Sequence, residues 1–271
     1  MNPYLSPESE TWIIGDVHGC RATLEKLFES IDAQSPQSRI YFVGDLVGKG
    51  PESAGVLEFV MNLGERAHVT LGNHDLHLLA CEEGMTRNIP TDRTASRLGA
   101  PASKVWRDWF LQQGFHHDLE NGDTQIRVVH AGIKPDWSED QFLHLSSQAA
   151  LAIKEGLSDW YKKPGHPIWE VVSILTRIRC VNIQDGSSLD NFTDHPKNAP
   201  QGHKPWFDVP RSSDNDRQIV FGHWARLGEY HKSGIHGIDG GCVYGGELIA
   251  MNPFKGTTLR VGCCDDLEIS P

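Results

Sequence analysis

The chain has 271 residues, of which 38% are hydrophobic and 23% are charged, and its formal net charge is −11. These proportions are ordinary for a globular protein with a full hydrophobic core. The acidic balance argues against duplex DNA as a partner, because sequence-independent binding to DNA depends on lysine and arginine side chains meeting phosphates. A small anion can still bind where bound divalent cations concentrate positive charge.

Residues 1–10 contain no apolar segment of the kind found in signal peptides, and we interpret them as a flexible N-terminus. No stretch approaches the ~18 consecutive apolar residues of a membrane span, so no membrane partner is expected. The six cysteines form no C-x-x-C pair and lie mostly in apolar segments. This favours reduced, buried thiols in a cytoplasmic protein, although an even number of cysteines leaves a disulfide open.

Short apolar runs alternate with helical patterns along the chain. Five runs predict strands: 12–14, 40–43, 69–71, 126–129 and 219–221. After each of the first three runs, apolar residues recur at helical spacing: within 24–31, 56–63 and 76–79. Strands that alternate with helices indicate an α/β fold with a largely parallel sheet. Ligands of such sheets bind at the carboxyl ends of the strands.

The segment of about 134–216 separates the fourth and fifth of these strands and has a different texture. Within it, 141–153 predicts one helix, and 168–181 predicts a second helix or a helix that ends in a strand. Residues 185–216 are rich in Pro, Asn, Asp, Ser and Gly and predict a loop. We therefore interpret 1–271 as a single domain with an inserted helical and loop cap over its site.

A short polar motif follows each predicted strand: GDVHG at 15–19, GDLVGKGP at 44–51, GNHD at 72–75, VHAG at 129–132 and FGHW at 221–224. These motifs supply six candidate metal ligands: Asp16, His18, Asp45, Asn73, His130 and His223. Carboxylate, amide and imidazole groups all bind divalent cations. A single GD pair is more often a turn with a helix cap, but five such segments in order favour the metal interpretation.

Six ligands with one shared carboxylate suit two adjacent metal ions, and such centres hydrolyse phosphate esters or anhydrides. Asp16 and His18 are one residue apart, so both point to one face of an extended segment. We assign Asp45 to the bridge, because a carboxylate has two oxygens to share. Asp16 and His18 would complete the coordination of one ion, and Asn73, His130 and His223 that of the other.

The motifs resemble those of the calcineurin-like metallophosphoesterases, in the branch that holds the serine/threonine protein phosphatases. Longer strings are similar to bacterial symmetrical diadenosine tetraphosphatases: GNHDLHLLA at 72–80, LTRIRC at 175–180, KPWF at 204–207, FGHWARL at 221–227 and IDGGCVYGGELIA at 238–250. The resemblance runs from about Thr11 to Met251. It implies a metallophosphoesterase fold of two packed mixed β-sheets flanked by helices, in α/β/β/α layers.

The resemblance also implies an activity, which is the cleavage of a dinucleoside polyphosphate, diadenosine tetraphosphate, to two ADP molecules. Two divalent metal ions would be required. Mn²⁺ or Co²⁺ is favoured, and the ligand types leave Fe, Zn and Mg open. Tetraphosphate-capped RNA 5′ ends are a further substrate that the resemblance leaves open.

His74 is the general-acid candidate, as the matching histidine of the family is, and Asp75 beside it could help to set its charge state. Lys49 lies where the protein phosphatases of this superfamily carry an arginine after an aspartate. Gly48 replaces that aspartate here, so the usual partner of the catalytic histidine is absent. Lysine keeps the positive charge for a phosphate group but loses the bidentate geometry of arginine.

Arg177 and Arg179 lie two residues apart, so in an extended segment both would face the same way and could bind phosphate oxygens. A solvated or salt-bridged pair is the alternative, and the resemblance favours phosphate contact by at least one of them. Five tryptophans are candidates for stacking on adenine, although each alone is more often a core residue: Trp137, Trp160, Trp169, Trp206 and Trp224.

Two other functions are open from the sequence. A phosphoprotein phosphatase would use the same metal site, but Gly48 and the long insertion argue against it. A non-enzymatic nucleotide sensor would be expected to have lost a ligand, whereas all six ligand positions are filled here.

Overall fold

Two five-stranded mixed sheets form the centre of the computed structural model, which describes residues 10–86, 100–189, 191–212 and 217–267. The first sheet has the order β12-β11-β1-β2-β3. Its strands are β1 (Thr11–Ile14), β2 (Arg39–Phe42), β3 (Ala67–Val69), β11 (Glu247–Asn252) and β12 (Thr257–Gly262). The neighbours β1, β2 and β3 pair in parallel, whereas β11 and β12 are antiparallel additions.

The second sheet has the order β4-β5-β8-β10-β9. Its strands are β4 (His116–Asn121), β5 (Thr124–Val129), β8 (Gln218–Phe221), β9 (Tyr230–Lys232) and β10 (Ile235–Gly237). The central strands β5, β8 and β10 pair in parallel. The five predicted strands are therefore present. The third was placed too far along the chain, because β3 ends at Val69. Thr70 forms an isolated bridge with Gly114, and the N–H of Leu71 bonds the Gly114 carbonyl.

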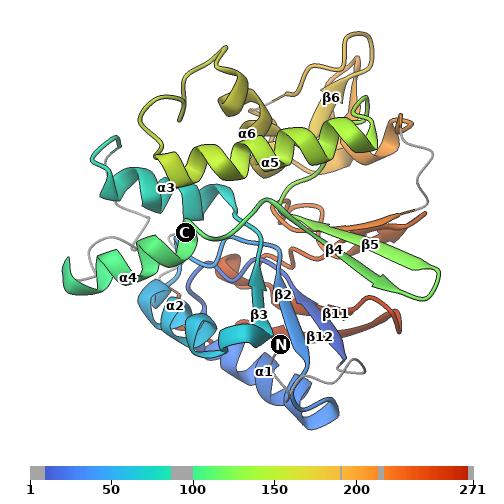
Figure 1. Cartoon of the computed structure of the whole chain (residues 1–271). Coiled ribbons are helices and arrows are strands. Elements are labelled where there is room, and N and C mark those ends of the chain that lie inside the picture. Colours follow the sequence, from blue (N-terminus) through green and yellow to red (C-terminus); the bar gives the residue numbers. More distant parts are fainter. Residues whose placement is uncertain (1–9, 87–99, 190, 213–216, 268–271) are drawn as a thin grey trace.

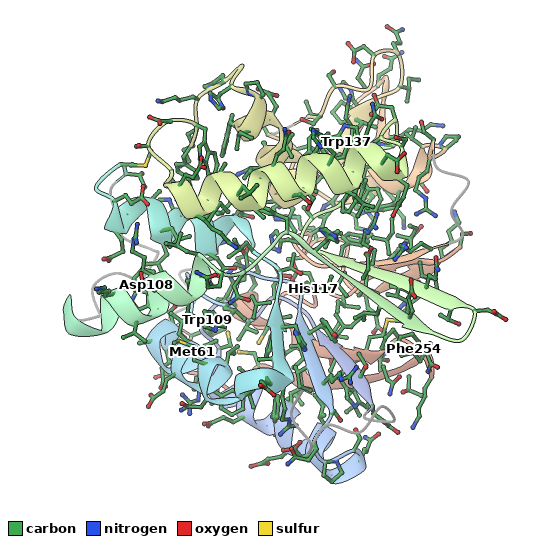
Figure 2. The ribbon with its side chains drawn as sticks, viewed as in Figure 1. Met61, Asp108, Trp109, His117, Trp137 and Phe254 are labelled. Carbon is green, nitrogen blue, oxygen red and sulfur yellow. The ribbon has the colours of Figure 1, made fainter. Side chains whose placement is uncertain are left out.

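The facing surfaces of the two sheets share an apolar core. Each sheet contributes alternate residues of its strands, and Val43 and Ile238 directly follow strands. The first sheet supplies Ile13, Tyr41, Val43, Ile249 and Met251, and the second supplies Leu119, Ile126, Val128, Val220 and Ile238. A polar contact adds to this packing, because the His117 ring of β4 bonds the Val69 carbonyl of β3 at 3.1 Å (Figure 2). The carboxyl ends of both parallel sets are thereby held side by side.

Helices cover the outer faces of the two sheets (Figure 1). They are α1 (Arg21–Gln34), α2 (Ser53–Asn62), α3 (Asn73–Glu82), α4 (Ala100–Phe110), α5 (Glu139–Glu155) and α6 (Pro167–Arg177). The predicted apolar stripe of α1 is buried against the first sheet: Leu24, Leu27, Phe28 and Ile31. Over the second sheet, Phe142 of α5 packs on the ring of His116 and under the guanidinium of Arg127. The layers are those of the predicted α/β/β/α fold.

The segment 134–216 contains more regular structure than its composition predicts. The expected helix at 141–153 is α5, and the second helix does end in a strand, because β6 (Cys180–Asn182) follows α6. The loop prediction for 185–216 is wrong in part, since β7 (His203–Pro205) pairs antiparallel with β6. Short 3-10 helices complete the described chain: Gly64–Arg66, Pro196–Asn198, Trp206–Asp208 and Cys242–Tyr244.

Two sequence predictions concern the ends and the surface of the molecule. Of the predicted flexible N-terminus, residues 1–9 lie outside the described part of the chain. Among the described helices, none has the length and apolar character that crossing a membrane requires. All six cysteines are free thiols, but Cys264 is exposed, so burial was not correct for every one of them.

Candidate dinuclear metal centre

The six candidate ligands lie together where the carboxyl ends of the two parallel strand sets meet. They follow β1, β2, β5 and β8 or begin α3, and each is at most 9% exposed. A cavity of about 640 Å³ opens over them, and four of the six contribute to its wall: His18, Asp45, Asn73 and His223. The sequence-predicted ligand set is thus assembled in one place.

Asp45 lies between two groups of imidazoles. Its Oδ2 is 3.6 Å from Nε2 of His18 and also 3.6 Å from Nε2 of His130. Its Oδ1 accepts a hydrogen bond of 2.8 Å from the backbone N–H of His74. On the far side of His18, the Oδ2 of Asp16 is 3.8 Å from the same Nε2. This is the arrangement expected if one Asp45 oxygen is shared between two ions.

Hydrogen bonds fix the orientation of the three imidazoles. Each ring bonds a backbone carbonyl through one nitrogen: His18 Nδ1 to Val47 at 3.2 Å, His130 Nδ1 to Val43 at 2.9 Å and His223 Nε2 to Arg177 at 3.2 Å. A carbonyl only accepts, so these ring nitrogens donate and the second nitrogen of each neutral ring keeps a lone pair. Burial lowers the pKa of all three rings, that of His18 to about 3, which keeps them neutral.

Acceptor atoms face one another across the site. The Oδ1 of Asn73 lies 3.4 Å from Nε2 of His130, the nitrogen that carries the lone pair. The lone-pair nitrogen of His18 similarly faces carboxylate oxygens of Asp16 and Asp45. Two acceptors without a proton between them repel each other, whereas a cation placed between them is bound by both. The donor set of this chain therefore fits divalent cations.

Buried carboxylates are a second reason to expect divalent cations at this site. Burial, together with Asp239 and Asp45, raises the pKa of Asp16 well above its usual range. Burial also raises the pKa of Asp75 to about 7 and that of Asp239 to about 6. Asp45 is the exception, because His130, His74 and His18 outweigh the effect of burial and hold its pKa low. Burying several carboxylates together is unfavourable unless cations compensate their charge.

Asp75 makes all its described hydrogen bonds to backbone N–H groups. Its Oδ2 accepts from Asp45 at 2.8 Å and from Gly72 at 2.9 Å, and its Oδ1 accepts from Leu46 at 3.0 Å. It is completely buried, and among the influences on its pKa that of His74 is the smallest. The side chain thus holds the GDL and GNH motifs in register, which makes Asp75 a positioning residue. That Asp75 also helps to set the charge state of His74 stays a prediction.

His74 itself faces the cavity. Its ring packs edge-on against that of His18, with ring centroids 4.8 Å apart, and it forms part of the cavity wall. A phosphate bound to cations held by Asp45 and His18 would lie beside this imidazole, which is the position that a general acid needs.

The cationic side chains differ from the sequence prediction. Lys49 and Arg179 contribute to the cavity wall, whereas Arg177 does not. Arg177 is the last residue of α6, and its guanidinium lies over the Trp169 ring at 5.9 Å. The two arginines would face the same way only in an extended segment, and this condition is not met, because α6 ends at Arg177. Contact of at least one of them with phosphate stays a prediction. Arg179 is held by the carbonyl of His223, at 3.1 Å from Nη2.

Aromatic candidates also change once the fold is known. Trp224 lines the cavity but is only 2% exposed, and Trp160 and Trp206 are equally buried in the core. Trp137, at the start of α5, and Trp169 pack against the core from outside the cavity (Figure 2). The exposed aromatic ring on the wall is that of Tyr244, which is 57% exposed. The ammonium of Lys49 bonds its hydroxyl and lies 4.7 Å from its ring centroid.

Asp239 was not singled out by the sequence analysis. It follows β10, which neighbours β8, and it is 4% exposed on the cavity wall. The sequence signal is weak, because the segment before Asp239 is Ile-His-Gly-Ile and contains only two apolar side chains, Ile235 and Ile238.

The backbone at the site is strained. His18, Asp45, Lys49 and His223 have φ values of 50°, 49°, 56° and 64°, in the left-handed region that non-glycine residues rarely adopt. Holding such a conformation costs on the order of 1–3 kcal/mol per residue. Three of the six ligands are in this group, so the direction of their side chains depends on the surrounding structure.

Gly222 allows the backbone of the fifth motif to approach Asp16. A Cβ atom at this position would lie 1.9 Å from Oδ1 of Asp16 and 2.6 Å from Cγ2 of Val43. We expect Gly222→Ala to displace the Asp16 carboxylate and to lower the metal content of the purified protein by about one ion per chain, as measured by elemental analysis. Gly114→Ala is the matched control, since its Cβ would meet nothing closer than 3.9 Å. Equal metal content in both variants would contradict a ligand role for Asp16.

The family model of the calcineurin-like phosphoesterases matches residues 10–252. The chain belongs to the calcineurin-like phosphoesterase family. Its relatives include the symmetrical bis(5′-nucleosyl)-tetraphosphatase of Janthinobacterium sp. (strain Marseille), which is 36% identical over 93% of this chain and 96% of its own. The protein of the same name from Yersinia pestis (strain Pestoides F) is 36% identical over 89% and 88%.

Solved structures agree with this family assignment. A crystal structure described as that of a candidate diadenosine tetraphosphatase has a TM-score of 0.65 and 25% identity, and the match covers 95% of this chain and 96% of that one. A protein serine/threonine phosphatase from Saccharomyces cerevisiae has a TM-score of 0.59 at 15% identity, covering 98% and 84%, so that likeness concerns the fold. Calcineurin-like phosphoesterases use two divalent cations, and the ligand groups described above fit them.

Proposed function

We propose that this chain hydrolyses diadenosine tetraphosphate symmetrically to two ADP molecules at a dinuclear metal centre. The observation that carries the proposal is the position of Asp45, whose Oδ2 is equidistant from the imidazoles of His18 and His130. Asp16, His18 and Asp45 would hold one cation, and Asn73, His130 and His223 would hold the other with Asp45. The relatives named as symmetrical tetraphosphatases support the choice of substrate.

The chain's own residues would bind and orient the polyphosphate. Two divalent cations, when bound, lower the pKa of water and offset phosphate charge. Lys49 and Arg179 add positive charge on the cavity wall, where they would contact phosphate oxygens. His74 would donate a proton to the leaving ADP, and Asp75 would keep its loop in place. Attack at an inner phosphorus leaves two phosphates on each half, so both products are ADP.

Tyr244 is our candidate for contact with a nucleobase. Its ring is the exposed aromatic surface on the cavity wall, and stacking a base on such a ring is worth ~1–3 kcal/mol. Tyr244→Ala should therefore raise KM for diadenosine tetraphosphate by about tenfold or more and change kcat less. Tyr244→Phe keeps the ring and loses only the hydroxyl that Lys49 bonds, so it should retain the wild-type KM. Similar KM values for Tyr244→Ala and the wild type would remove Tyr244 from the base site.

The product ratio from diadenosine tetraphosphate tests the proposed function. Metal-free protein would be reloaded with Mn²⁺ or Co²⁺ first, then with Fe²⁺, Zn²⁺ or Mg²⁺, and the nucleotides separated by chromatography. Two ADP per substrate supports the proposal, whereas AMP plus ATP rejects symmetric cleavage.

A phosphopeptide assayed in parallel tests the phosphoprotein phosphatase alternative. No turnover with any of these metals would favour a nucleotide sensor. Tetraphosphate-capped RNA carries a similar phosphate chain and belongs in the same assay.

A further inference from the structure

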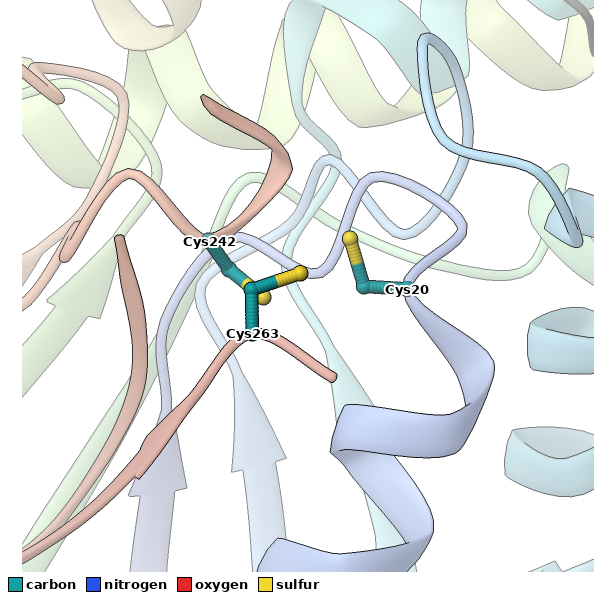
Figure 3. A group of neighbouring side chains, drawn as sticks. All are labelled: Cys20, Cys242 and Cys263. Atoms are coloured by element: carbon teal, nitrogen blue, oxygen red, sulfur yellow. The ribbon is translucent and has the colours of Figure 1, made fainter. Parts of the chain in front are cut away.

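Three cysteines from distant parts of the sequence bring their sulfur atoms together (Figure 3). The Sγ atoms of Cys20, Cys242 and Cys263 all lie within 4.8 Å of one another. Cys20 and Cys242 are buried, Cys263 is half-buried, and all three are free thiols. The thiol cluster shares no residue with the six ligands of the phosphoesterase site.

The surroundings of the thiol cluster are polar on one side. Cys20 is the residue directly before α1, so the positive end of that helix dipole lies at the cluster. The hydroxyl of Thr23 lies 3.8 Å from Sγ of Cys263 and 2.5 Å from Oδ2 of Asp265. Asp265 also accepts the backbone N–H groups of Ala22 and Thr23 at 2.9 and 3.0 Å. The Thr23 hydroxyl therefore borders the sulfur of Cys263, and the carboxylate of Asp265 caps the start of α1 next to it. Polar groups in such positions form the outer shell of many metal sites.

We propose that Cys20, Cys242 and Cys263 bind one thiophilic cation, Zn²⁺, as three thiolate ligands. Thiolates select Zn²⁺ among the common divalent cations, whereas the oxygen-rich phosphoesterase site accepts harder ions as well. Binding converts three thiols to three thiolates, so three protons pass to solvent for each ion bound. The fourth position of the tetrahedral ion is left for a solvent oxygen, because Cys263 is partly accessible.

The distances suit such a site after a small contraction. A Zn–S bond of ~2.3 Å in a tetrahedral ion corresponds to a sulfur–sulfur separation of about 3.8 Å. The widest pair in the thiol cluster, within 4.8 Å, needs to close by about 1 Å at most to reach that separation. Side-chain rotation at the half-buried Cys263, which lies in the chain after β12, can supply a movement of this size.

A bound ion would link three segments covalently that otherwise meet only through the packing of the hydrophobic core and hydrogen bonds. Cys20 follows the GDVHG motif, Cys242 follows Asp239 and precedes Tyr244, and Cys263 lies near the end of the described chain. The ion would therefore fix the Tyr244 segment against the start of α1. We expect it to raise the melting temperature of the protein without taking part in hydrolysis.

Cobalt provides a test that separates the two metal centres. Co²⁺ substitutes for Zn²⁺, and sulfur-to-cobalt charge-transfer absorption arises only where a thiolate is a ligand. The phosphoesterase site offers oxygen and nitrogen alone. Protein whose phosphoesterase site is loaded with Mn²⁺ should gain this absorption on titration with Co²⁺, saturating at one equivalent. Cys263→Ser should lose most of it and bind at least ~10²-fold more weakly, because one of three thiolates is removed. Cys180→Ser changes a buried thiol outside the cluster and should match the wild type.

A second measurement uses the unmodified chain. With the phosphoesterase site loaded with Mn²⁺, one equivalent of Zn²⁺ should protect three of the six thiols from an alkylating reagent, and mass spectrometry of peptides should identify them as Cys20, Cys242 and Cys263. Absence of sulfur-to-cobalt absorption in the wild type, or equal absorption in Cys263→Ser, would overturn the proposal. The three thiols would then be small packing residues. Neither readout uses hydrolysis, so failure here leaves the proposed phosphoesterase function untouched.

Discussion

The substitution Asp45→Asn is expected to abolish hydrolysis of diadenosine tetraphosphate and to lower the metal content. A neutral amide cannot balance two dications, and the Oδ2 position between His18 and His130 would lose its charge. Loss of a metal-activated nucleophile corresponds to a fall in kcat of ~10³-fold or more. The measurements are initial rates at saturating Mn²⁺ and metal content by elemental analysis.

Asp108→Asn is the matched control for this experiment. Asp108 is an exposed aspartate of α4 whose described ion pair is with the adjacent Arg107, at 3.7 Å (Figure 2). That variant should keep the wild-type rate and metal content. If Asp45→Asn retained more than a tenth of the wild-type rate at saturating metal, Asp45 would not be the bridging ligand.

The second large effect is expected from His74→Ala, and it should depend on the leaving group. An alkoxide is strongly basic and must be protonated as it leaves, whereas ADP leaves as a far less basic phosphate oxygen. Gly48 stands where related phosphatases keep the aspartate that holds the catalytic histidine, so the chain fits a reaction with less need of a general acid. General-acid help is worth ~10²- to 10⁴-fold. The loss on an alkyl phosphate should exceed the loss on diadenosine tetraphosphate by about tenfold or more.

Two controls make this comparison interpretable. Metal content must be measured in His74→Ala, because His74 follows the ligand Asn73 and its backbone N–H bonds Asp45. His144→Ala removes an exposed imidazole on α5 and should leave both rates unchanged. Equal losses on the two substrates with both metals present would mean that His74 mainly binds phosphate. The absence of aspartate at Gly48 would then carry no information about the leaving group.

That the six candidate ligands lie together could be predicted from the sequence, because each of them belongs to a local motif at the end of a strand. A strand that ends in Gly-Asp or in His-Ala-Gly places a polar side chain at the carboxyl edge of a parallel sheet, and neighbouring strands share that edge. Asp16, Asp45 and His130 follow this rule directly. His223 follows it as well, although about ninety residues separate it from His130, because β8 pairs with β5.

The remaining parts of the site depend on tertiary structure that no local pattern contains. Arg177 and Arg179 diverge because α6 ends between them, and helix boundaries are read from sequence only to within a few residues. The role of Asp75 required knowledge of which backbone N–H groups face it across the GDL motif. Trp224 and Tyr244 both line the cavity, but Trp224 is 2% exposed and Tyr244 is 57% exposed. Composition and spacing do not reveal which of two rings the core covers.

The left-handed backbone at His18, Asp45 and His223 has a consequence for evolution and engineering. Glycine adopts this conformation without steric cost, so at each of these positions a glycine would relieve strain in the folded backbone. It would also remove a candidate ligand. A search for thermostable variants that scored stability alone would therefore select substitutions at the residues to which we assign metal binding. Natural proteins accept such trade-offs at working sites. In this chain the two packed sheets hold His18, Asp45 and His223 in a backbone conformation that glycine would adopt with less strain.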